Sequence, residues 1–266
     1  MTNHYQPPRA RPAVSVIVPA LGNSPSLTPT LQLIRDALDG AYDFEVLVVV
    51  DTHVPGPALR DTRMFAFEHD ARVHAQEVRG QKVTAVRWGM EHARGQIIGY
   101  LDGDAGWEAD PVHLRTIVDA VATGGADCAC AQRNQTHWSG LRRAKTALFS
   151  RLARTLFRLP IADTQAPMKF FTRHATELLL DHGAWKGWEF DVDLLWVLHT
   201  AGARIHTIPV TWRSNGGEAG WVTALLLATT APGMIRNLIT LRLRTRQRAG
   251  HIRAAAHSAP PNPGCQ

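Results

Sequence analysis

The sequence predicts an α/β fold with a mostly parallel central sheet and helices on both of its faces. Short apolar segments of strand character alternate along the chain with amphipathic segments of helical length, as in repeated strand–helix–strand units. Carboxylates stand at the ends of two apolar segments, at Asp51 and Asp102. Ligands of open α/β sheets bind beyond the carboxyl ends of the strands. These observations together indicate a ligand site at one edge of the predicted sheet.

The expected elements follow one another in a regular order from Val14. Val14 to Val18 and Glu45 to Val50 are apolar runs rich in valine, as in strands covered on both faces, and Leu31 to Leu38 is the helix between them. The remaining expected elements are a weak strand at Arg72–Ala75, a helix that follows Gly80 and stops at Gly95, a strand at Ile97–Leu101, a helix at Pro111–Val121, a strand at Asp127–Ala131, a helix within Ser139–Leu159, a helix that opens near Trp188 and a last strand from Arg204 to Trp212.

Composition and charge indicate a globular protein with an anionic partner. The chain has 266 residues and is 45% hydrophobic, which suits one α/β domain with appendages and excludes bulk disorder. The net charge is +6, so a nucleotide diphosphate, a lipid phosphate, a membrane or a nucleic acid would all be attracted. No acidic residue occurs between Asp127 and Asp163 or after Glu218. Two basic segments therefore lie on a body of mixed charge.

The cysteines and the apolar segments indicate the cellular compartment in which we expect the protein. Cys128 and Cys130 alternate along a predicted strand and face one side of it, so we interpret them as small core residues in a reducing cytoplasm. The first 13 residues lack the apolar core of a signal peptide. The longest late apolar run, Val222 to Leu241, is interrupted by Pro232, Gly233 and Arg236, so a membrane-spanning helix is not expected there.

The stretch from Gly80 to Asp104 carries the strongest chemical signal. Asp102 and Asp104 stand one residue apart at the end of the strand Ile97–Leu101. Two carboxylates in this arrangement are suitable ligands for Mg²⁺ or Mn²⁺, and a metal held in this way can carry a diphosphate. The alternative is a plain turn, because Asp and Gly are among the commonest turn residues.

Several motifs occur together in a known order. They are Gly80-Gln81-Lys82, Ala85-Val86-Arg87, Gly89-Met90, Ala93-Arg94-Gly95, Asp102-Gly103-Asp104, Asp163 to Phe170 (DTQAPMKF), Phe190-Asp191-Val192-Asp193-Leu194 and Pro209-Val210-Thr211-Trp212. In order and spacing the set resembles the signature of inverting family 2 glycosyltransferases. The resemblance is closest to the branch that loads a sugar onto a polyprenyl phosphate, such as the dolichyl-phosphate glucosyl- and mannosyltransferases, and it covers roughly Val14 to Arg246.

The resemblance implies a Rossmann-like GT-A glycosyltransferase fold and a metal-dependent transfer from a nucleotide-diphosphate sugar. A UDP-sugar is the family default, and the implied acceptor is a polyprenyl phosphate. We expect a disordered N-terminus at residues 1–12, the GT-A domain at residues 13–220, amphipathic basic helices at residues 221–248 and a disordered tail at residues 249–266.

The resemblance also assigns residues to the donor side of the site. Asp102 and Asp104 would hold Mg²⁺ or Mn²⁺, and the nucleotide sugar would be bound by Pro19, Asp51, Lys82, Asp102, Arg133, Gln165 and Lys169. The chain departs from the family pattern at Leu21, Asn23, Val50 and Gly106. These departures leave the nucleotide open, and Glu108 becomes a possible further metal ligand.

Gln165, Lys169, Asp191 and Asp193 are the expected residues at the sugar and the acceptor. Gln165 would face the sugar and Lys169 the acceptor phosphate. Asp191 and Asp193 are predicted as a catalytic pair. Either would remove the proton of a hydroxyl acceptor, whereas both would only orient an acceptor phosphate, which is already ionised. The structural alternative is that they cap a helix.

Two basic amphipathic segments indicate an anionic membrane surface as a further partner. In Ser139–Leu159 an apolar stripe of leucines alternates with arginines and a lysine, and Arg242, Arg244, Arg246 and Arg248 follow an apolar run later in the chain. Such helices can lie on anionic lipid. We expect a cytoplasmic protein, peripheral at the inner face of the membrane. The alternative is that both helices dock on the protein's own core.

Two other functions remain open at this point. The same chemistry could act on a soluble acceptor, such as a natural-product scaffold. The chain could also be a catalytically silent binding module for nucleotides or nucleic acid. A nucleic-acid partner is not indicated, because no recognised nucleic-acid motif accompanies the basic segments.

Overall fold

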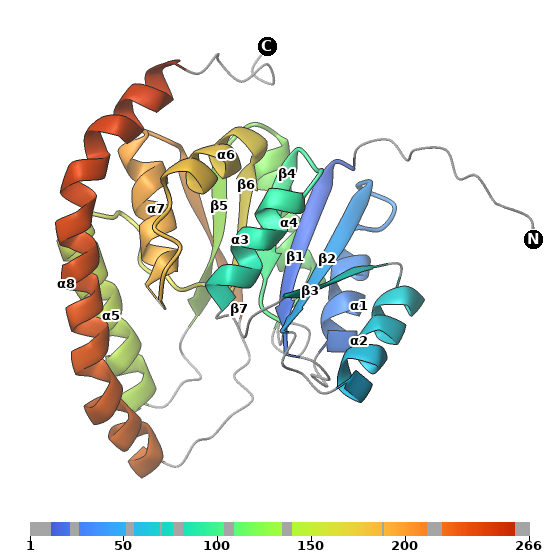
Figure 1. Cartoon of the computed structure of the whole chain (residues 1–266), viewed down its shortest axis with the longest axis horizontal. Coiled ribbons are helices and arrows are strands. Elements are labelled where there is room, and N and C mark those ends of the chain that lie inside the picture. The colour runs from blue at the N-terminus through green and yellow to red at the C-terminus, as the bar shows by residue number, and fades with distance from the viewer. Residues whose placement is uncertain are drawn as a thin grey trace, which may run out of the picture.

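The computed structural model confirms a mostly parallel sheet with helices on both faces (Figure 1). It describes residues 12–21, 27–51, 56–69, 71–76, 82–103, 109–134, 140–187, 189–211 and 220–258. Within these residues the strands form one seven-stranded sheet in the order β3-β2-β1-β4-β6-β5-β7. The strands are β1 (Val14–Ala20), β2 (Phe44–Asp51), β3 (Arg72–Gln76), β4 (Ile97–Leu101), β5 (Cys128–Asn134), β6 (Met168–Thr172) and β7 (Ile205–Thr211).

The strand directions bring several loops to one edge of the sheet. β3, β2, β1 and β4 are parallel to one another, and β5 is parallel to β7. β6 is antiparallel to both of its neighbours, β4 and β5. The start of β6 therefore lies at the same edge as the ends of the other strands. We call this edge the carboxyl edge.

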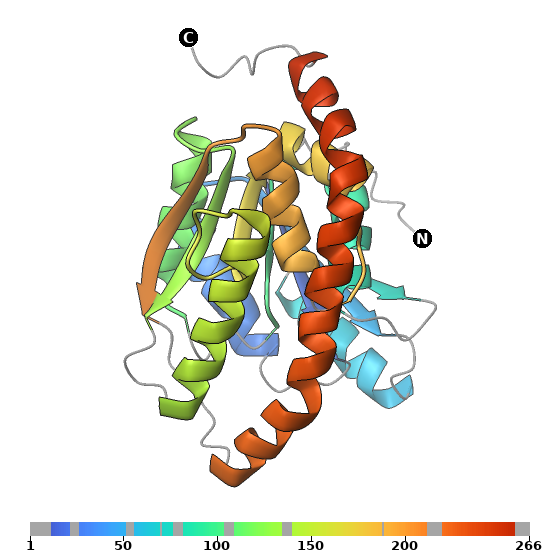
Figure 2. The same ribbon diagram turned by 90° about the vertical axis from the view of Figure 1, so that its left-hand side faces the viewer.

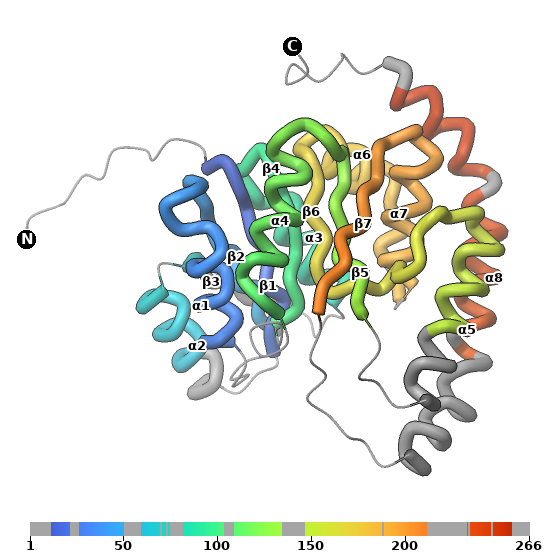
Figure 3. The backbone as a smooth tube through the Cα atoms, turned by 180° about the vertical axis from the view of Figure 1, so that it is seen from behind, coloured from blue at the N-terminus to red at the C-terminus, as the bar shows by residue number. Residues whose placement is uncertain are grey.

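Helices cover both faces of the sheet. They are α1 (Leu27–Leu38), α2 (Gly56–Glu68), α3 (Lys82–His92), α4 (Pro111–Ala122), α5 (Gly140–Phe157), α6 (Arg173–His182), α7 (Phe190–Thr200) and α8 (Gly220–Ser258). One core cluster joins the sheet to α3 and α5 to α8, and the other joins it to α1, α2 and α4. α8 packs across α5, α6 and α7 on the outside of the first layer (Figure 2). α4 lies over the opposite face (Figure 3).

The predicted strands and most predicted helices are present within a few residues of their expected bounds. Cys128 and Cys130 are fully buried on β5, which confirms their interpretation as core residues. Three elements were not predicted, namely α2, β6 and α6. β6 was missed because Lys169 interrupts its apolar pattern, and α2 because most of its described side chains are exposed.

The C-terminal region differs from the prediction. A single helix, α8, runs for 39 residues to Ser258, whereas a disordered tail was expected from Ala249. Its last part is ordered because Ile252 is fully buried in the core cluster. Within the described residues, none of the helices combines the length and apolar character that crossing a membrane requires.

Candidate active site

The turn after β4 brings Asp102 to the carboxyl edge. The amide of Asp102 donates to the carbonyl of Pro167, before β6, at 3.1 Å. The Gly103 carbonyl accepts a hydrogen bond from Thr30 Oγ1 at 2.9 Å. A Cβ at Gly103 would lie 2.9 Å from the carbonyl oxygen of Pro19, so this close approach requires glycine. The Asp-Gly pair is therefore a turn that is hydrogen-bonded to Thr30 of α1 and to Pro167 before β6, and it packs closely against β1.

Lys82, the first residue of α3, reaches across to Asp102. Its Nζ lies 2.6 Å from Asp102 Oδ1, and 5.0 Å from the centre of the Tyr100 ring. Both charged side chains are partly exposed. Burial would lower the pKa of Lys82, but the negative charges of Asp102 and Asp191 raise it above its ordinary value. Lys82 is thus a stable cation at the carboxyl edge.

A second cluster lies deeper, between β4, β6 and α7. Lys169 Nζ is 2.6 Å from Asp191 Oδ1 and also donates to the carbonyl of Ala166 at 2.7 Å. The Tyr100 hydroxyl donates to the same Asp191 oxygen. Tyr100 and Lys169 are register neighbours on β4 and β6. Lys169 is fully buried, so it faces Asp191 and not an open acceptor position, in contrast to the prediction.

This cluster keeps Asp191 ionised. Burial opposes ionisation, but the charges of Lys169 and Lys82 and the hydrogen bond from Tyr100 lower the pKa of Asp191 below its ordinary value. Burial and the charge of Asp191 raise the pKa of Tyr100 well above its usual range, so its hydroxyl stays a hydrogen-bond donor. Asp191 is accordingly a weak proton acceptor at neutral pH.

Arg133 at the end of β5 is paired with Asp163. Its Nε and Nη2 lie 2.7 and 2.9 Å from the two carboxylate oxygens of Asp163. Burial would lower the pKa of Arg133, but Asp163 raises it, with smaller contributions from Asp102 and Asp191. Arg133 is therefore close enough to Asp102 and Asp191 for their negative charges to affect its pKa. Asp163 occupies the planar fork that we expected to bind phosphate.

Asp193 points away from this cluster. Arg248 of α8 donates to both of its carboxylate oxygens, at 2.7 and 3.1 Å, and the amide of Ala184 donates at 2.5 Å. Asp193 is fully buried. Residues two apart on a helix lie about 200° apart around its axis, so Asp191 and Asp193 do not form a pair on one face. The predicted pairing of the two carboxylates is wrong in geometry, and Asp193 anchors α8.

The structure describes the remaining predicted residues only in part. Pro19 lies in β1 and Asp51 ends β2, both at the carboxyl edge, and the Asp51 side chain is not described. Gln165 is partly buried in the loop before β6. Asp104, Gly106 and Glu108 lie outside the described residues.

The donor set at Asp102 suits a hard divalent cation. Asp102 Oδ1 is buried, and its close neighbour is the ammonium of Lys82, at 2.6 Å. A carboxylate oxygen is the type of ligand that Mg²⁺ prefers, so Asp102 fits as one ligand of such a cation if Lys82 moves away from it. In the described part of the chain, His, Cys, Asp and Glu do not form a group of three or more that could hold a metal. Asp104, the second predicted metal ligand, lies outside the described residues.

The sequence analysis did not predict the contacts that two residues, Tyr100 and Asp163, make in this site. Tyr100 was treated only as part of a strand, and Asp163 only as the start of a motif. The alternation of a strand would have indicated Tyr100, because Tyr100 and Asp102 lie two residues apart and so share a face. The Asp163 contact joins residues 30 positions apart, and no local pattern indicates it.

The fold and the position of the site define a class of protein. The chain resembles the crystal structure of glucosyl-3-phosphoglycerate synthase from Mycobacterium tuberculosis in complex with Mn²⁺, UDP and glucosyl-3-phosphoglycerate, with a TM-score of 0.64 and 19% identity. The likeness covers 90% of this chain and 80% of that chain. The fold is that of the GT-A glycosyltransferases, as the sequence predicted.

The family follows from the sequence comparison. Residues 15–180, more than half of the chain, match the model of Glycosyl transferase family 2. The chain belongs to this family.

Curated relatives agree with the family. Glycosyltransferase AglD of Haloferax volcanii is 29% identical over 211 residues, which make up 76% of this chain and 33% of that protein. Dolichyl-phosphate beta-glucosyltransferase ALG5C of Trichomonas vaginalis is 27% identical over 226 residues, which make up 79% of this chain and 66% of that protein. The chain thus spans a third of the first relative and just under two thirds of the second.

Proposed function

We propose that the chain transfers a sugar, with inversion, from a nucleotide-diphosphate sugar to a polyprenyl phosphate. The observation that carries the proposal is the carboxyl edge, where Asp102 faces Lys82 beside the cluster of Lys169 and Asp191. Membership of family 2 supports the reaction class. The name of the Trichomonas relative, a dolichyl-phosphate glucosyltransferase, supports the acceptor.

Asp102, together with Asp104, would hold Mg²⁺ or Mn²⁺. When bound, the metal neutralises charge on the diphosphate leaving group. Lys82 would then turn from Asp102 to the phosphate oxygens, where a compact ammonium offsets negative charge. Arg133 would contribute a second positive charge at the rim, held in place by Asp163.

Asp191 orients the site and does not act as a base in this proposal. Its lowered pKa and its contacts to Lys169 and Tyr100 make it a poor proton acceptor. A phosphate monoester has its second pKa at about 6, so it is mostly ionised at neutral pH and needs no base to attack. The buried, ionised Asp191 therefore favours a phosphate acceptor over an alcohol.

The proposal places the acceptor at an anionic membrane surface on the cytoplasmic side. α5 and α8 both begin at the end of the molecule where β5 and β7 end (Figures 1 and 2). Leu148 on α5 and Ile239 and Leu243 on α8 are 56%, 49% and 62% exposed. Exposed apolar side chains among arginines suit contact with anionic lipid.

A transfer assay tests the proposal. The protein is incubated with a panel of nucleotide sugars, with Mn²⁺ or Mg²⁺, and with either a polyprenyl phosphate or the matching polyprenol in detergent. We expect labelled sugar in the organic phase with the phosphate and not with the alcohol. Asp102→Asn should reduce this transfer about 100-fold or more without a change in melting temperature. Transfer to polyprenol at an equal rate would contradict the proposed role of Asp191.

A soluble phosphorylated acceptor is the second candidate. The structural neighbour is a synthase of glucosyl-3-phosphoglycerate, and that likeness carries the fold alone. The same assay with soluble phosphorylated acceptors separates the two candidates, because its product stays in the aqueous phase. A product found only there would replace the lipid acceptor by a soluble one.

A further inference from the structure

A pocket of about 400 Å³ lies between α5, α7 and α8, apart from the carboxyl edge. It is lined by Phe157, Arg158, Trp196, His199, Thr200, Arg242, Thr245, Ala249 and Arg253. α7 begins with Phe190 and Asp191 beside the candidate active site, and it contributes its last turns to the pocket. The pocket is therefore at the other end of α7. Its size is that of a small-molecule site, for which about 300–1,000 Å³ is usual.

The lining of the pocket is strongly basic. Three arginines and His199 line it, and among the described residues its lining includes no Asp or Glu. Within the described residues, neither Arg158 nor Arg242 forms an ion pair. Arg242 Nη1 donates to Thr245 Oγ1 at 3.0 Å, which fixes its guanidinium at the pocket wall. Arg248, on the same helix, is by contrast neutralised by Asp193.

Helix ends account for only part of this charge. α5 ends at Phe157 and α7 at Thr200, so both present carbonyl groups near the arginines. Each helix carboxyl end is equivalent to about half a negative charge. Two such ends offset about one of the two charges of Arg158 and Arg242. A net positive charge of about one remains from these two arginines, which an anion would compensate.

The pocket combines this charge with an apolar wall. Phe157 and Trp196 are buried beside it. Guanidinium groups match the geometry of phosphate oxygens through paired N–H donors. We propose that the pocket binds a ligand that carries a phosphate group, either a soluble phosphorylated compound or a lipid headgroup. This proposal does not depend on the proposed transferase function, because none of its residues belongs to the carboxyl edge.

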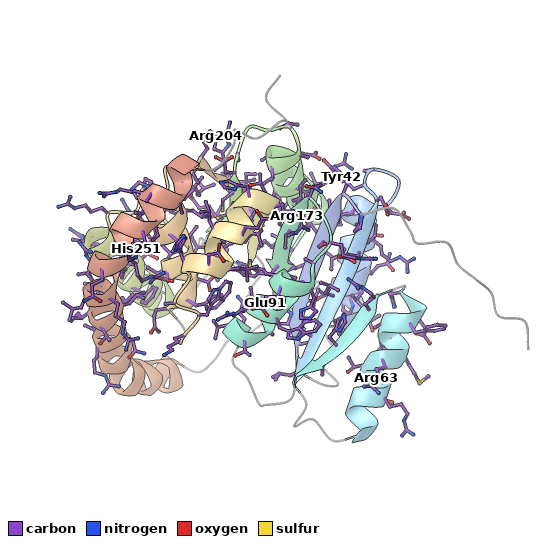
Figure 4. All side chains as sticks on the ribbon, turned by 45° about the horizontal axis from the view of Figure 1, so that its top comes forward. Tyr42, Arg63, Glu91, Arg173, Arg204 and His251 are labelled. Carbon is purple, nitrogen blue, oxygen red and sulfur yellow. The ribbon has the colours of Figure 1, made fainter. Side chains whose placement is uncertain are left out.

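Phosphate binding tests the proposal directly. Inorganic phosphate and pyrophosphate are titrated calorimetrically into the full chain in the presence of EDTA, which removes divalent cations from the carboxyl edge. Replacing two guanidinium donors, in R158Q/R242Q, should weaken binding at least about tenfold, because hydrogen bonds to charged groups contribute strongly. The matched control is R60Q/R63Q, which removes two exposed arginine charges from α2. Arg63 lies far from His251 of α8 (Figure 4).

A third variant distinguishes the two sites. Lys82→Met removes a cation from the carboxyl edge and leaves the pocket intact, so the phosphate binding that R158Q/R242Q weakens should persist in it. Binding that is lost in Lys82→Met and kept in R158Q/R242Q would overturn the proposal. Equal affinity in all variants would overturn it as well. Should R158Q/R242Q fail to fold, the single change of exposed Arg158→Gln carries the test in the same direction.

Vesicles identify the source of the phosphate group. Phosphatidylcholine vesicles with and without phosphatidic acid are sedimented with each variant. Weaker retention of R158Q/R242Q than of R60Q/R63Q on phosphatidic acid would assign the pocket to a lipid headgroup. Equal retention, together with weaker binding of free phosphate, would assign it to a soluble ligand.

Discussion

At the scale of single residues, three cations that the structure describes at the carboxyl edge each have a carboxylate partner. Lys82 pairs with Asp102, Lys169 with Asp191 and Arg133 with Asp163. Of these three pairs, only Lys82 and Asp102 both have side chains that are about a quarter to a third exposed. Exchange of partners is therefore easiest there, because little buried charge has to be uncovered. This difference separates the pair that can bind a ligand from the pairs that hold the site in shape.

The buried Asp191 cluster predicts a large loss of stability. Asp191→Asn leaves the ammonium of Lys169 buried without its partner charge, and breaking a buried pair costs about 3–5 kcal/mol. Tyr100→Phe removes one hydrogen bond to the same carboxylate and should cost less, about 1.5–3 kcal/mol. Urea unfolding of the two variants checks this order. An Asp191→Asn variant as stable as Tyr100→Phe would contradict the assigned cluster.

Glu45 predicts a pH dependence of stability at the other end of β2. Burial opposes its ionisation, but hydrogen bonds from the Arg94 amide and Ser15 and the charge of Arg72 lower the pKa of Glu45 below its ordinary 4.5. A lowered folded-state pKa contributes stability above the unfolded pKa, and this stability is lost as the pH falls through the folded value.

Glu45→Gln should therefore lower the free energy of unfolding by about 2 kcal/mol at neutral pH. The difference from wild type should narrow as the pH falls below 4.5. Urea titrations at several pH values measure it, with Glu91→Gln as the control, since Glu91 forms an exposed ion pair. If the difference in the free energy of unfolding stays constant with pH, the charge of Glu45 does not stabilise the folded protein.

At the scale of elements, β4, β6 and α7 assemble the site, and α8 is tied to α7. Arg248 of α8 bonds Asp193 and the carbonyl of His182, and its guanidinium lies 5.3 Å from the Trp196 ring. α8 is thereby joined to the helix that carries Asp191. The position of this helix affects the geometry of the active site.

A double-mutant cycle tests this connection. Arg248→Met leaves Asp193 buried and unpaired, so it should destabilise the protein by about 3–5 kcal/mol. Asp193→Asn should also destabilise it. The double variant should lose less stability than the sum of the two single losses, by a coupling energy of about 1–3 kcal/mol. The reason is that mutational effects on residues in direct contact are not additive. Additive losses would show that the two residues act independently.

The elements also show how far sequence reasoning extends. β1, β2 and β4 were predicted because buried parallel strands are continuous apolar runs, and Asp102 was placed because it follows such a run. β6 was missed because the ammonium of Lys169 is compensated by Asp191, which lies 22 positions away. The opposite directions of Asp191 and Asp193 follow from helical periodicity and were predictable. The anchoring of Asp193 by Arg248 was not, because it joins residues 55 positions apart.

At the scale of the whole molecule, part of the basic charge of α8 lies among the protein's own helices. Arg242 lines the pocket between α5, α7 and α8, and Arg248 binds Asp193. Arg244 on α8, Arg151 and Arg154 on α5, and Arg158 directly after α5 are exposed. In the proposed contact with a membrane, exposed apolar side chains such as Ile239 and Leu243 would act together with these charges.

Vesicle sedimentation tests this view. I239S/L243S should reduce binding to anionic vesicles several-fold, because buried apolar area and charge both contribute to interfacial binding. The matched control is M64S/F67S, which changes two exposed apolar residues of α2. Binding of the wild type should weaken with added salt. Equal loss in both variants would mean that this face of α8 is not the membrane contact.

Calorimetric titration of UDP with and without Mn²⁺ tests most directly whether Asp102 holds the metal of a bound nucleotide diphosphate. Mn²⁺ should strengthen UDP binding to the wild type at least about tenfold. Asp102→Asn should lose this dependence while keeping its melting temperature without ligand. UDP binding that is equally strong with and without Mn²⁺, or a Mn²⁺ dependence retained in Asp102→Asn, would contradict the claim.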